Sequence, residues 1–300
     1  MQFSLKNSLN SSLKSSIIIL KLVVPIYILA DVLIYYNLLS YITFIFEPIT
    51  SFLDLPSEAA LAIVSGMFLN LYAAIAFAAP LGLSPKEWTV LAVFLGICHS
   101  LIVETAIMKK LGISKTFSIS LRVIAGLLVG YITTLLPQSW FNATQILSDN
   151  QSIPAYNTVF ELLASSLKEA LYLSVQIIIL IALIIIILDF IKSLKVIEKY
   201  LSKVNSSFSI TIGVILGITY GAGVLIDEYN KNALTKKEVL YIGTFLMICH
   251  AIIEDTLLFV IFGANIWIIV TLRVVFAFIF AGICVKLFYF NKKTNDKILT

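Results

Sequence analysis

Charged side chains are scarce in this chain. Only 13% of its 300 residues are Asp, Glu, Lys or Arg, while 60% are hydrophobic. Soluble domains carry about 25% charged residues, so this composition excludes a soluble globule. The mean hydropathy is +1.01, and apolar runs of about 20 residues recur, each long enough to cross the hydrocarbon core of a bilayer as a helix. We therefore predict an all-α polytopic membrane protein.

Residues that build covalent frameworks and active sites are also few. The three cysteines, Cys98, Cys249 and Cys284, all lie in apolar segments and make no disulfide framework. No nucleophile–base arrangement, phosphate-binding glycine loop or zinc-protease motif occurs, so we expect neither an enzyme nor a cofactor. No basic patch with interleaved aromatic residues supports nucleic-acid binding, and the net charge of +4 is interpreted as membrane topology.

The chain has only two histidines, and both lie in a phrase that occurs twice. Ile97–Thr105 reads ICHSLIVET and Ile248–Thr256 reads ICHAIIEDT, with an offset of 151 residues between His99 and His250. The same register extends without a gap on both sides of the two phrases. A duplicated half that puts ionisable residues inside an apolar helix is typical of a transporter built from two structural repeats.

This register predicts a division of the chain into two membrane repeats. The predicted segments are a cytoplasmic tail over 1–15, repeat one over 16–136, an extracytoplasmic linker over 137–165, repeat two over 166–288 and a cytoplasmic tail over 289–300. Each repeat is expected to hold about three spanning helices. Lysines surround one apolar face over 194–204, which predicts an interfacial amphipathic helix; its counterpart over 41–55 is interrupted by Pro48.

A further segment of about 24 residues in each repeat decides the topology. The segments 57–80 and 206–229 carry glycine or asparagine near their middles, which favours a broken, re-entrant helical hairpin over a crossing. If the hairpins turn back, sixteen lysines lie on one side of the membrane and two on the other. The positive-inside rule favours this arrangement. It predicts two inverted-topology repeats in a prokaryotic inner membrane, with both termini cytoplasmic.

The two histidines lie near the centres of the predicted third spans, 87–111 and 238–262. An inverted two-fold axis would place His99 and His250 at the same depth, where they can approach each other. A neutral imidazole there can bind a solute, carry a proton or bind a metal. The structural alternative is a hydrogen bond between two helices.

Each repeat also carries an embedded acid and an embedded arginine. Glu104 and Arg122 lie about equally far from the turn at Gly112, and Asp255 and Arg273 occupy the same positions in repeat two. We expect two ion pairs, since an isolated charge in a bilayer is costly. These pairs are either structural or open to take an ion or proton. Glu254 has no acidic counterpart in repeat one and is the candidate functional carboxylate.

The hairpins supply the remaining binding candidates, because broken helices expose backbone groups to a solute; these are Asn70, Tyr72, Tyr220 and Gly221. The alternative is that glycine only permits close helix packing. For a metal, the candidate ligands are His99, His250, Cys98 and Cys249. Neighbouring Cys and His residues lie about 100° apart on a helix, which makes joint ligation of one ion difficult.

These motifs together resemble the Gate, or nucleoside-recognition, family of membrane proteins. The motifs that carry the resemblance are Leu55-Pro56-Ser57-Glu58, Ser84-Pro85-Lys86-Glu87 with His99 to Thr105, and Leu234 to Glu238 with His250 to Thr256. The resemblance covers nearly the whole chain as two Gate copies. Related domains occur in ferrous-iron transporters, spore maturation membrane proteins and, more distantly, concentrative nucleoside transporters. The resemblance implies a transport-type fold and leaves the substrate open.

The sequence therefore predicts a membrane transporter of a small polar solute or ion, coupled to protons or another cation. Its site would lie at the midplane between the two repeats. A divalent metal carrier is one alternative. A non-transporting membrane component, such as a partner subunit or a lipid-handling protein, is another. The expected partners are the lipid bilayer and the solute or ion, the assembly considered is a homodimer, and no nucleic acid is expected.

Overall fold

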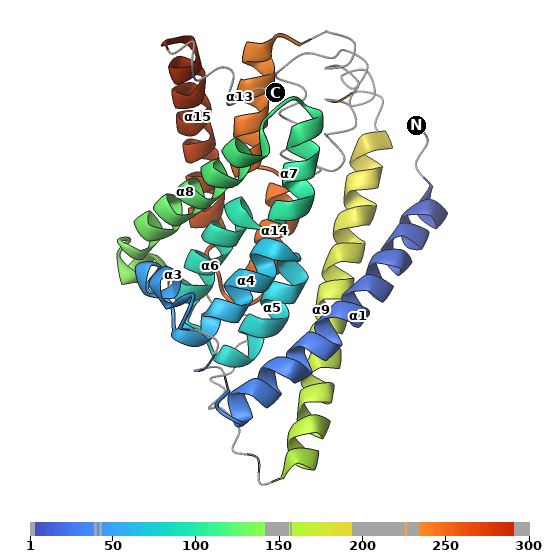
Figure 1. The fold of residues 1–300 in the computed structure, drawn as a ribbon. Coiled ribbons are helices and arrows are strands. Elements are labelled where there is room, and N and C mark those ends of the chain that lie inside the picture. The colour runs from blue at the N-terminus through green and yellow to red at the C-terminus, as the bar shows by residue number, and fades with distance from the viewer. Residues whose placement is uncertain are drawn as a thin grey trace.

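The computed structural model describes residues 4–38, 41, 44–141, 156, 158–193, 226 and 234–290. Every regular element in these ranges is a helix (Figure 1). The longer ones are α1 (Leu5–Tyr35), α6 (Pro85–Cys98), α7 (Leu101–Lys110), α8 (Lys115–Thr134), α9 (Val159–Ser193), α13 (Lys236–Ile248), α14 (Ile252–Val260) and α15 (Ile266–Phe290). With α6–α7 and α13–α14 each taken as one stretch, six are long and apolar enough to cross a membrane. The prediction of an all-α polytopic membrane protein is confirmed.

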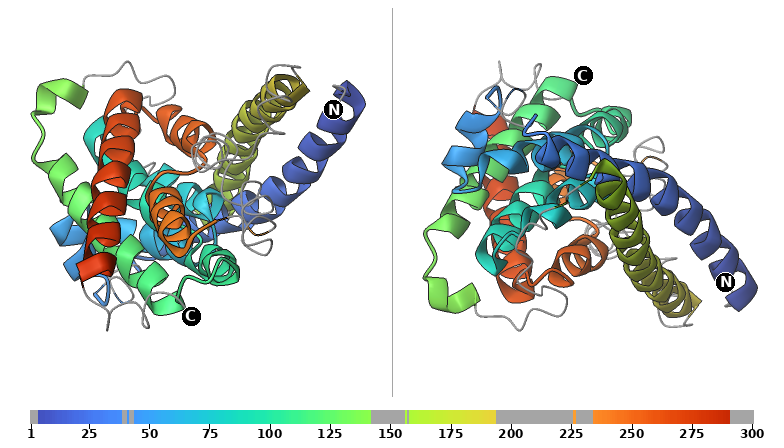
Figure 2. Two further views of the ribbon diagram at one scale, coloured as in Figure 1. Left: turned by 90° about the horizontal axis from the view of Figure 1, so that it is seen from above. Right: turned by 90° about the horizontal axis from the view of Figure 1, so that it is seen from below.

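Helices α1 and α9 form a long antiparallel pair beside the remaining helices (Figures 1 and 2). Side-chain hydrogen bonds join them toward both ends: Ser8 Oγ donates to Asp189 Oδ2 at 2.8 Å, and Ser166 Oγ donates to Asp31 Oδ2 at 2.5 Å. Both helices start earlier than predicted, since α1 begins within the expected tail and α9 within the expected linker. The domain boundaries themselves stay a prediction.

The first hairpin segment is broken, as predicted. After α3 (Glu47–Phe52) and a 3-10 turn over Ser57–Ala59, α4 (Ala60–Phe68) ends and α5 (Leu71–Ala78) packs back against it, followed by a 3-10 turn over Ala79–Leu81. The turn between α4 and α5 is set by Asn70, whose side-chain oxygen accepts the backbone N–H of Ala73 at 3.0 Å. Apart from Ile226, the second hairpin, 206–229, lies outside the described residues, and so does the amphipathic segment 194–204.

The predicted third spans begin in the same way. Ser84 and Glu87 form a reciprocal capping box at the start of α6, and Thr235 and Glu238 form the matching one at the start of α13. Capping boxes satisfy backbone N–H groups at a helix start that have no partner within the helix. These stretches are also the most enclosed of the six, at 72% and 78% buried against at most 44% for the others. They therefore form the centre of the molecule.

The predicted third spans, 87–111 and 238–262, correspond to candidate membrane spans over Pro85–Lys110 and Lys236–Val260, but neither is one continuous helix. One stretch breaks between α6 and α7 at His99 and Ser100, and the other breaks between α13 and α14 at Cys249 to Ala251. Neither break contains glycine or proline. The histidines thus lie at helix ends, where backbone groups lack a partner within the helix.

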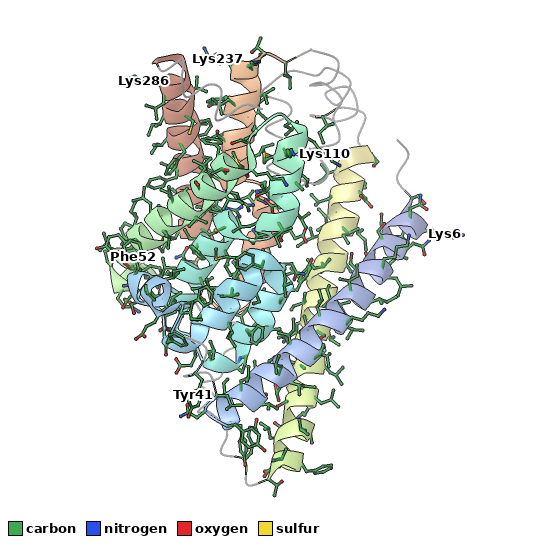
Figure 3. The ribbon with its side chains drawn as sticks, in the orientation of Figure 1. Lys6, Tyr41, Phe52, Lys110, Lys237 and Lys286 are labelled. Carbon is green, nitrogen blue, oxygen red and sulfur yellow. The ribbon has the colours of Figure 1, made fainter. Side chains whose placement is uncertain are left out.

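Corresponding helices of the two halves run in opposite directions. Lys110, at the end of α7, lies at the same end of the molecule as Lys237, at the start of α13, while Tyr41 lies toward the other end (Figure 3). Likewise α8 runs away from that end and α15 runs toward it, with Lys286 near its terminus (Figure 1). Antiparallel matched helices are the arrangement that inverted repeats require.

Candidate functional site

Two left-handed residues redirect the backbone at the helix breaks. Ser100 has φ 47° and Ala251 has φ 44°, at matching positions of the repeated phrase. For a residue with a Cβ atom this conformation costs roughly 1–2 kcal/mol. In the first half the first hairpin supports it: the Ser100 N–H donates to Gly66 O at 2.9 Å and its hydroxyl donates to Leu69 O at 3.1 Å. A strained conformation held by its surroundings is a reason to look for function at this point.

The histidine rings have the same orientation in both halves. His99 Nδ1 lies 2.8 Å from Leu95 O, and His250 Nδ1 lies 2.7 Å from Leu246 O. A carbonyl oxygen only accepts hydrogen bonds, so each Nδ1 carries a hydrogen and each neutral ring presents the lone pair of Nε2. The ring centroids are 5.1 Å apart. The two buried rings, 8% and 2% exposed, therefore present the same kind of atom to a shared space.

Glu104 occupies that space. Its Oε1 lies 3.1 Å from His99 Nε2 and 3.2 Å from His250 Nε2, while Oε2 lies 2.9 Å from Arg122 Nη2. We call His99, His250 and Glu104 the histidine junction. Two imidazole lone pairs facing one carboxylate oxygen repel one another unless a positive charge lies between them. A proton or a cation between these atoms would relieve the repulsion.

The two arginines close the helix breaks. In the first half Arg122 donates from Nε to Ile97 O and from Nη2 to His99 O, each at 2.7 Å. In the second half Arg273 donates to the matching carbonyls of Ile248 and His250 at 3.2 and 2.7 Å. Both side chains are fully buried. Each guanidinium thus satisfies carbonyls that the broken helix leaves open and neutralises a nearby acid.

The second acid of the duplicated pattern is arranged differently. Asp255 Oδ2 lies 3.2 Å from Arg273 Nη2, so the structure brings both predicted acid–arginine pairs together. One ligand-type atom from each of His99, His250 and Asp255 lies within 4.8 Å of the others. These residues come from both halves, and α15 also packs against α6: a methyl group at Gly96 would approach Arg273 Cζ to 3.1 Å.

Glu254 lies beside the junction and contacts the first hairpin. Tyr72, in α5, donates its hydroxyl hydrogen to Glu254 Oε1 at 3.0 Å. This bond connects the second half of the chain to the hairpin of the first. Glu254, which has no acidic counterpart in repeat one, is therefore hydrogen-bonded to a helix of repeat one.

The other predicted candidates are less directly placed. Asn70 uses its side-chain oxygen to cap α5. Tyr220 and Gly221 lie outside the described residues. Cys98 and Cys249 are buried, and neither belongs to the group of metal-ligand atoms found in the described part of the chain. A methyl group at Gly126 of α8 would lie 3.2 Å from Cys98 Cβ, so Cys98 packs toward α8.

Three features of the site were missed by sequence reasoning. They are the left-handed Ser100 and Ala251, the carbonyl partners of the histidine and arginine side chains, and the sharing of Glu104 by both histidines. The one signal was the small residue after each repeated histidine, Ser in one copy and Ala in the other. Small residues at that point are also ordinary in packed membrane helices.

The fold and this site define a polytopic α-helical membrane protein with a buried charge cluster where its two halves meet. Residues 16–115 match the model of the Gate family, described as nucleoside recognition. The family resemblance predicted from the motifs is confirmed there. The chain is also similar to the uncharacterized membrane protein YvoD of Bacillus subtilis (strain 168). The two are 28% identical over 266 residues, which cover 85% of each chain. No solved structure matches the chain significantly.

Proposed function

We propose that this protein is a membrane transporter of a small polar solute or ion, with its binding site at the histidine junction between two inverted repeats. The observation that carries the proposal is the convergence of both histidines, one from each half, on Glu104 Oε1 at 3.1 and 3.2 Å. A site shared by two halves changes its geometry whenever the halves move against each other. Such a change is what alternating access requires.

The broken helices support the same proposal. Irregular backbone at membrane depth is tolerated only where it is buried in protein or lines a water-filled cavity. Both breaks lie near the middle of stretches that are otherwise long enough to span, Pro85–Lys110 and Lys236–Val260. A structural hydrogen bond between two helices would not need two strained backbone positions, since regular helices can donate side chains to each other.

The acids near the junction supply the means of coupling. Glu104, Asp255 and Glu254 carry three formal negative charges, while Arg122 and Arg273 carry two positive ones. A bound proton or cation would offset the remaining negative charge. The Tyr72–Glu254 hydrogen bond connects this group of charges to the first hairpin. Binding at the junction would therefore alter a contact of that hairpin.

The test is a thermal-shift screen on the purified chain with nucleosides and divalent metals, comparing wild type with the His99→Ala, His250→Ala double variant. Binding of a ligand to the native state raises the unfolding temperature in proportion to RT ln(1 + [L]/Kd). We expect at least one compound to stabilise the wild type and not the double variant. A single structural hydrogen bond in a membrane bundle contributes about 0.6 kcal/mol, so the double variant should still fold. A folded double variant that keeps wild-type binding of every stabilising compound would refute the proposal.

A further inference from the structure

The orientation of the two histidines matches that of metal-ligating histidines. A ligating imidazole almost always donates its other N–H to a carboxylate, a backbone carbonyl or water, which fixes the ring and raises the basicity of the ligating nitrogen. Here both Nδ1 atoms lie within 2.8 Å of a carbonyl oxygen. Both Nε2 atoms are thereby directed, unprotonated in the neutral ring, toward the same space.

The spacing of the junction atoms also suits a metal ion. Zinc binds imidazole nitrogen and carboxylate oxygen at 2.0–2.2 Å in a tetrahedron, so neighbouring ligand atoms are separated by about 3.3 Å. Glu104 Oε1 lies 3.1 and 3.2 Å from the two Nε2 atoms. His250 is buried, and its Nε2 atom faces Glu104 Oε1 at ion-pair distance. Asp255, whose ligand atom lies within 4.8 Å of the histidines, would complete the set by a closer approach.

We propose that the histidine junction binds a divalent first-row transition-metal ion, with His99 Nε2, His250 Nε2 and Glu104 as ligands and Asp255 as the fourth. The inference rests on the proposed function, because it names the cargo of the same site. Imidazole suits Zn, Fe, Ni and Cu ions, whereas Ca²⁺ and Mg²⁺ prefer an all-oxygen set. The ligand chemistry therefore selects the transition-metal class.

The charge balance of the cluster permits a dication despite the two arginines. Without a metal, three carboxylates and two guanidiniums leave one formal negative charge, and with a dication they leave one positive charge. The size of the imbalance is the same in both states. Each guanidinium is also held by two backbone carbonyls, so the arginines do not depend on the carboxylates alone.

Metal titration of the full chain in lipid nanodiscs tests the site directly, after tag removal and stripping with a chelator. We expect Zn²⁺ to bind at a single site per chain by calorimetry, and Co²⁺ to give the visible ligand-field bands of a low-symmetry four-coordinate site. Loss of an outer-shell partner costs 10–100-fold in metal affinity. Replacing a ligand in His99→Gln or His250→Gln should therefore weaken Zn²⁺ binding by at least about 100-fold.

The matched controls are Cys98→Ser and Cys249→Ser, which change adjacent residues outside the junction. They should bind Zn²⁺ as the wild type does, and selective loss of binding in either one would overturn the ligand assignment. A measurement on the wild type needs no variant. The chain has only two histidines, so the X-ray absorption spectrum of zinc-loaded protein should show imidazole nitrogen and carboxylate oxygen ligands at about 2.0–2.2 Å. A zinc shell without imidazole scattering would overturn the inference even if the variants misfold.

Two outcomes separate this inference from the proposed function. If Zn²⁺ does not bind the wild type, but another solute stabilises it in a histidine-dependent manner, the metal inference fails and the transporter proposal stands. If Zn²⁺ binds in a histidine-dependent manner, but reconstituted vesicles take up no labelled zinc or other solute, the metal site stands and transport fails. Histidine-dependent binding together with uptake supports both.

Discussion

The two halves of the chain use the same frame around the histidines but different acids. In both halves an arginine donates to the carbonyls of a broken helix, and a histidine donates to the carbonyl four residues before it. The acids differ by one methylene. Glu104 reaches its arginine and both histidines, whereas Asp255 forms an ion pair with Arg273 only.

This difference separates the parts of the site that hold the backbone in place from the acids that can bind a ligand. The backbone breaks, capping boxes and arginine bonds recur in both halves because the fold needs them at both positions. Asp255 has the shorter side chain, and His250 instead contacts Glu104, the acid of the other half. Glu254, which has no counterpart, adds a third carboxylate that is tied to the first hairpin by Tyr72. The duplicated frame therefore holds an asymmetric set of acids.

The antiparallel course of the matched helices makes the largest prediction, an all-or-none labelling pattern. In a background with the three buried cysteines replaced, Tyr41→Cys should react with a membrane-impermeant maleimide added to intact cells. Lys110→Cys and Lys237→Cys should be protected, since both ends lie together, opposite Tyr41 (Figure 3). Labelling of only one of the two lysine positions would mean that the halves are not inverted.

Removal of either arginine should cause the largest loss of stability, and the size of the loss should differ between the two halves. Arg122→Ala leaves Glu104 and two carbonyls unpaired in a low dielectric, which we expect to destabilise the protein by about 3–5 kcal/mol. Arg273→Ala should cost less, because two of its three contacts are 3.2 Å long whereas those of Arg122 are 2.7–2.9 Å. Unfolding midpoints in detergent measure both values.

The control for this comparison removes the acid together with its arginine. Arg273→Ala combined with Asp255→Ala should recover part of the loss, because no unpaired charge is then buried. A double variant no more stable than Arg273→Ala alone would show that the Arg273–Asp255 ion pair does not stabilise the protein. The matching change in the first half, Arg122→Ala with Glu104→Ala, should recover less stability, since Glu104 also serves the two histidines.

Loss of the Tyr72 hydroxyl should have the smallest effect on stability. Tyr72→Phe removes one hydrogen bond to Glu254 and should cost roughly 0.5–1.5 kcal/mol, more if the carboxylate is left unsatisfied. If the bond couples the hairpin to the junction, ligand affinity should change by more than stability does. The control is Glu254→Val, which copies Val103 of the first half and should make Tyr72→Phe nearly neutral. Equal effects of Tyr72→Phe in both backgrounds would show that the bond contributes nothing.

Much of this arrangement follows from the sequence. The offset between the two histidines predicts the matching positions, and the similar distances of Glu104 and Arg122 from Gly112 predict that the two side chains meet across a turn. Gly66 and Asn70 near the middle of an apolar segment favour the broken first hairpin, and in the structure the Asn70 side chain caps α5. These features depend on local pattern and on the cost of a buried charge, and both can be evaluated from a sequence.

The helix breaks could not be predicted in the same way. Ser100 and Ala251 adopt a left-handed conformation that alanine rarely adopts, so propensity favours an uninterrupted helix there. Tertiary contacts override it: Ser100 is held by two carbonyls of the first hairpin, and both arginines come from the following helices. The sharing of Glu104 depends on how the halves dock, and no local pattern encodes that.

The number of long helices in each half has an evolutionary consequence. Among the described residues, three potential crossings end before residue 137 and three begin after residue 158. When a unit with an odd number of crossings is joined to a copy of itself, the copy must enter the bilayer in the opposite orientation. A duplication of such a unit would therefore account for the antiparallel arrangement of the matched helices by parity alone. It would also leave each half free to change its own acid, and Glu104 and Asp255 differ in this way.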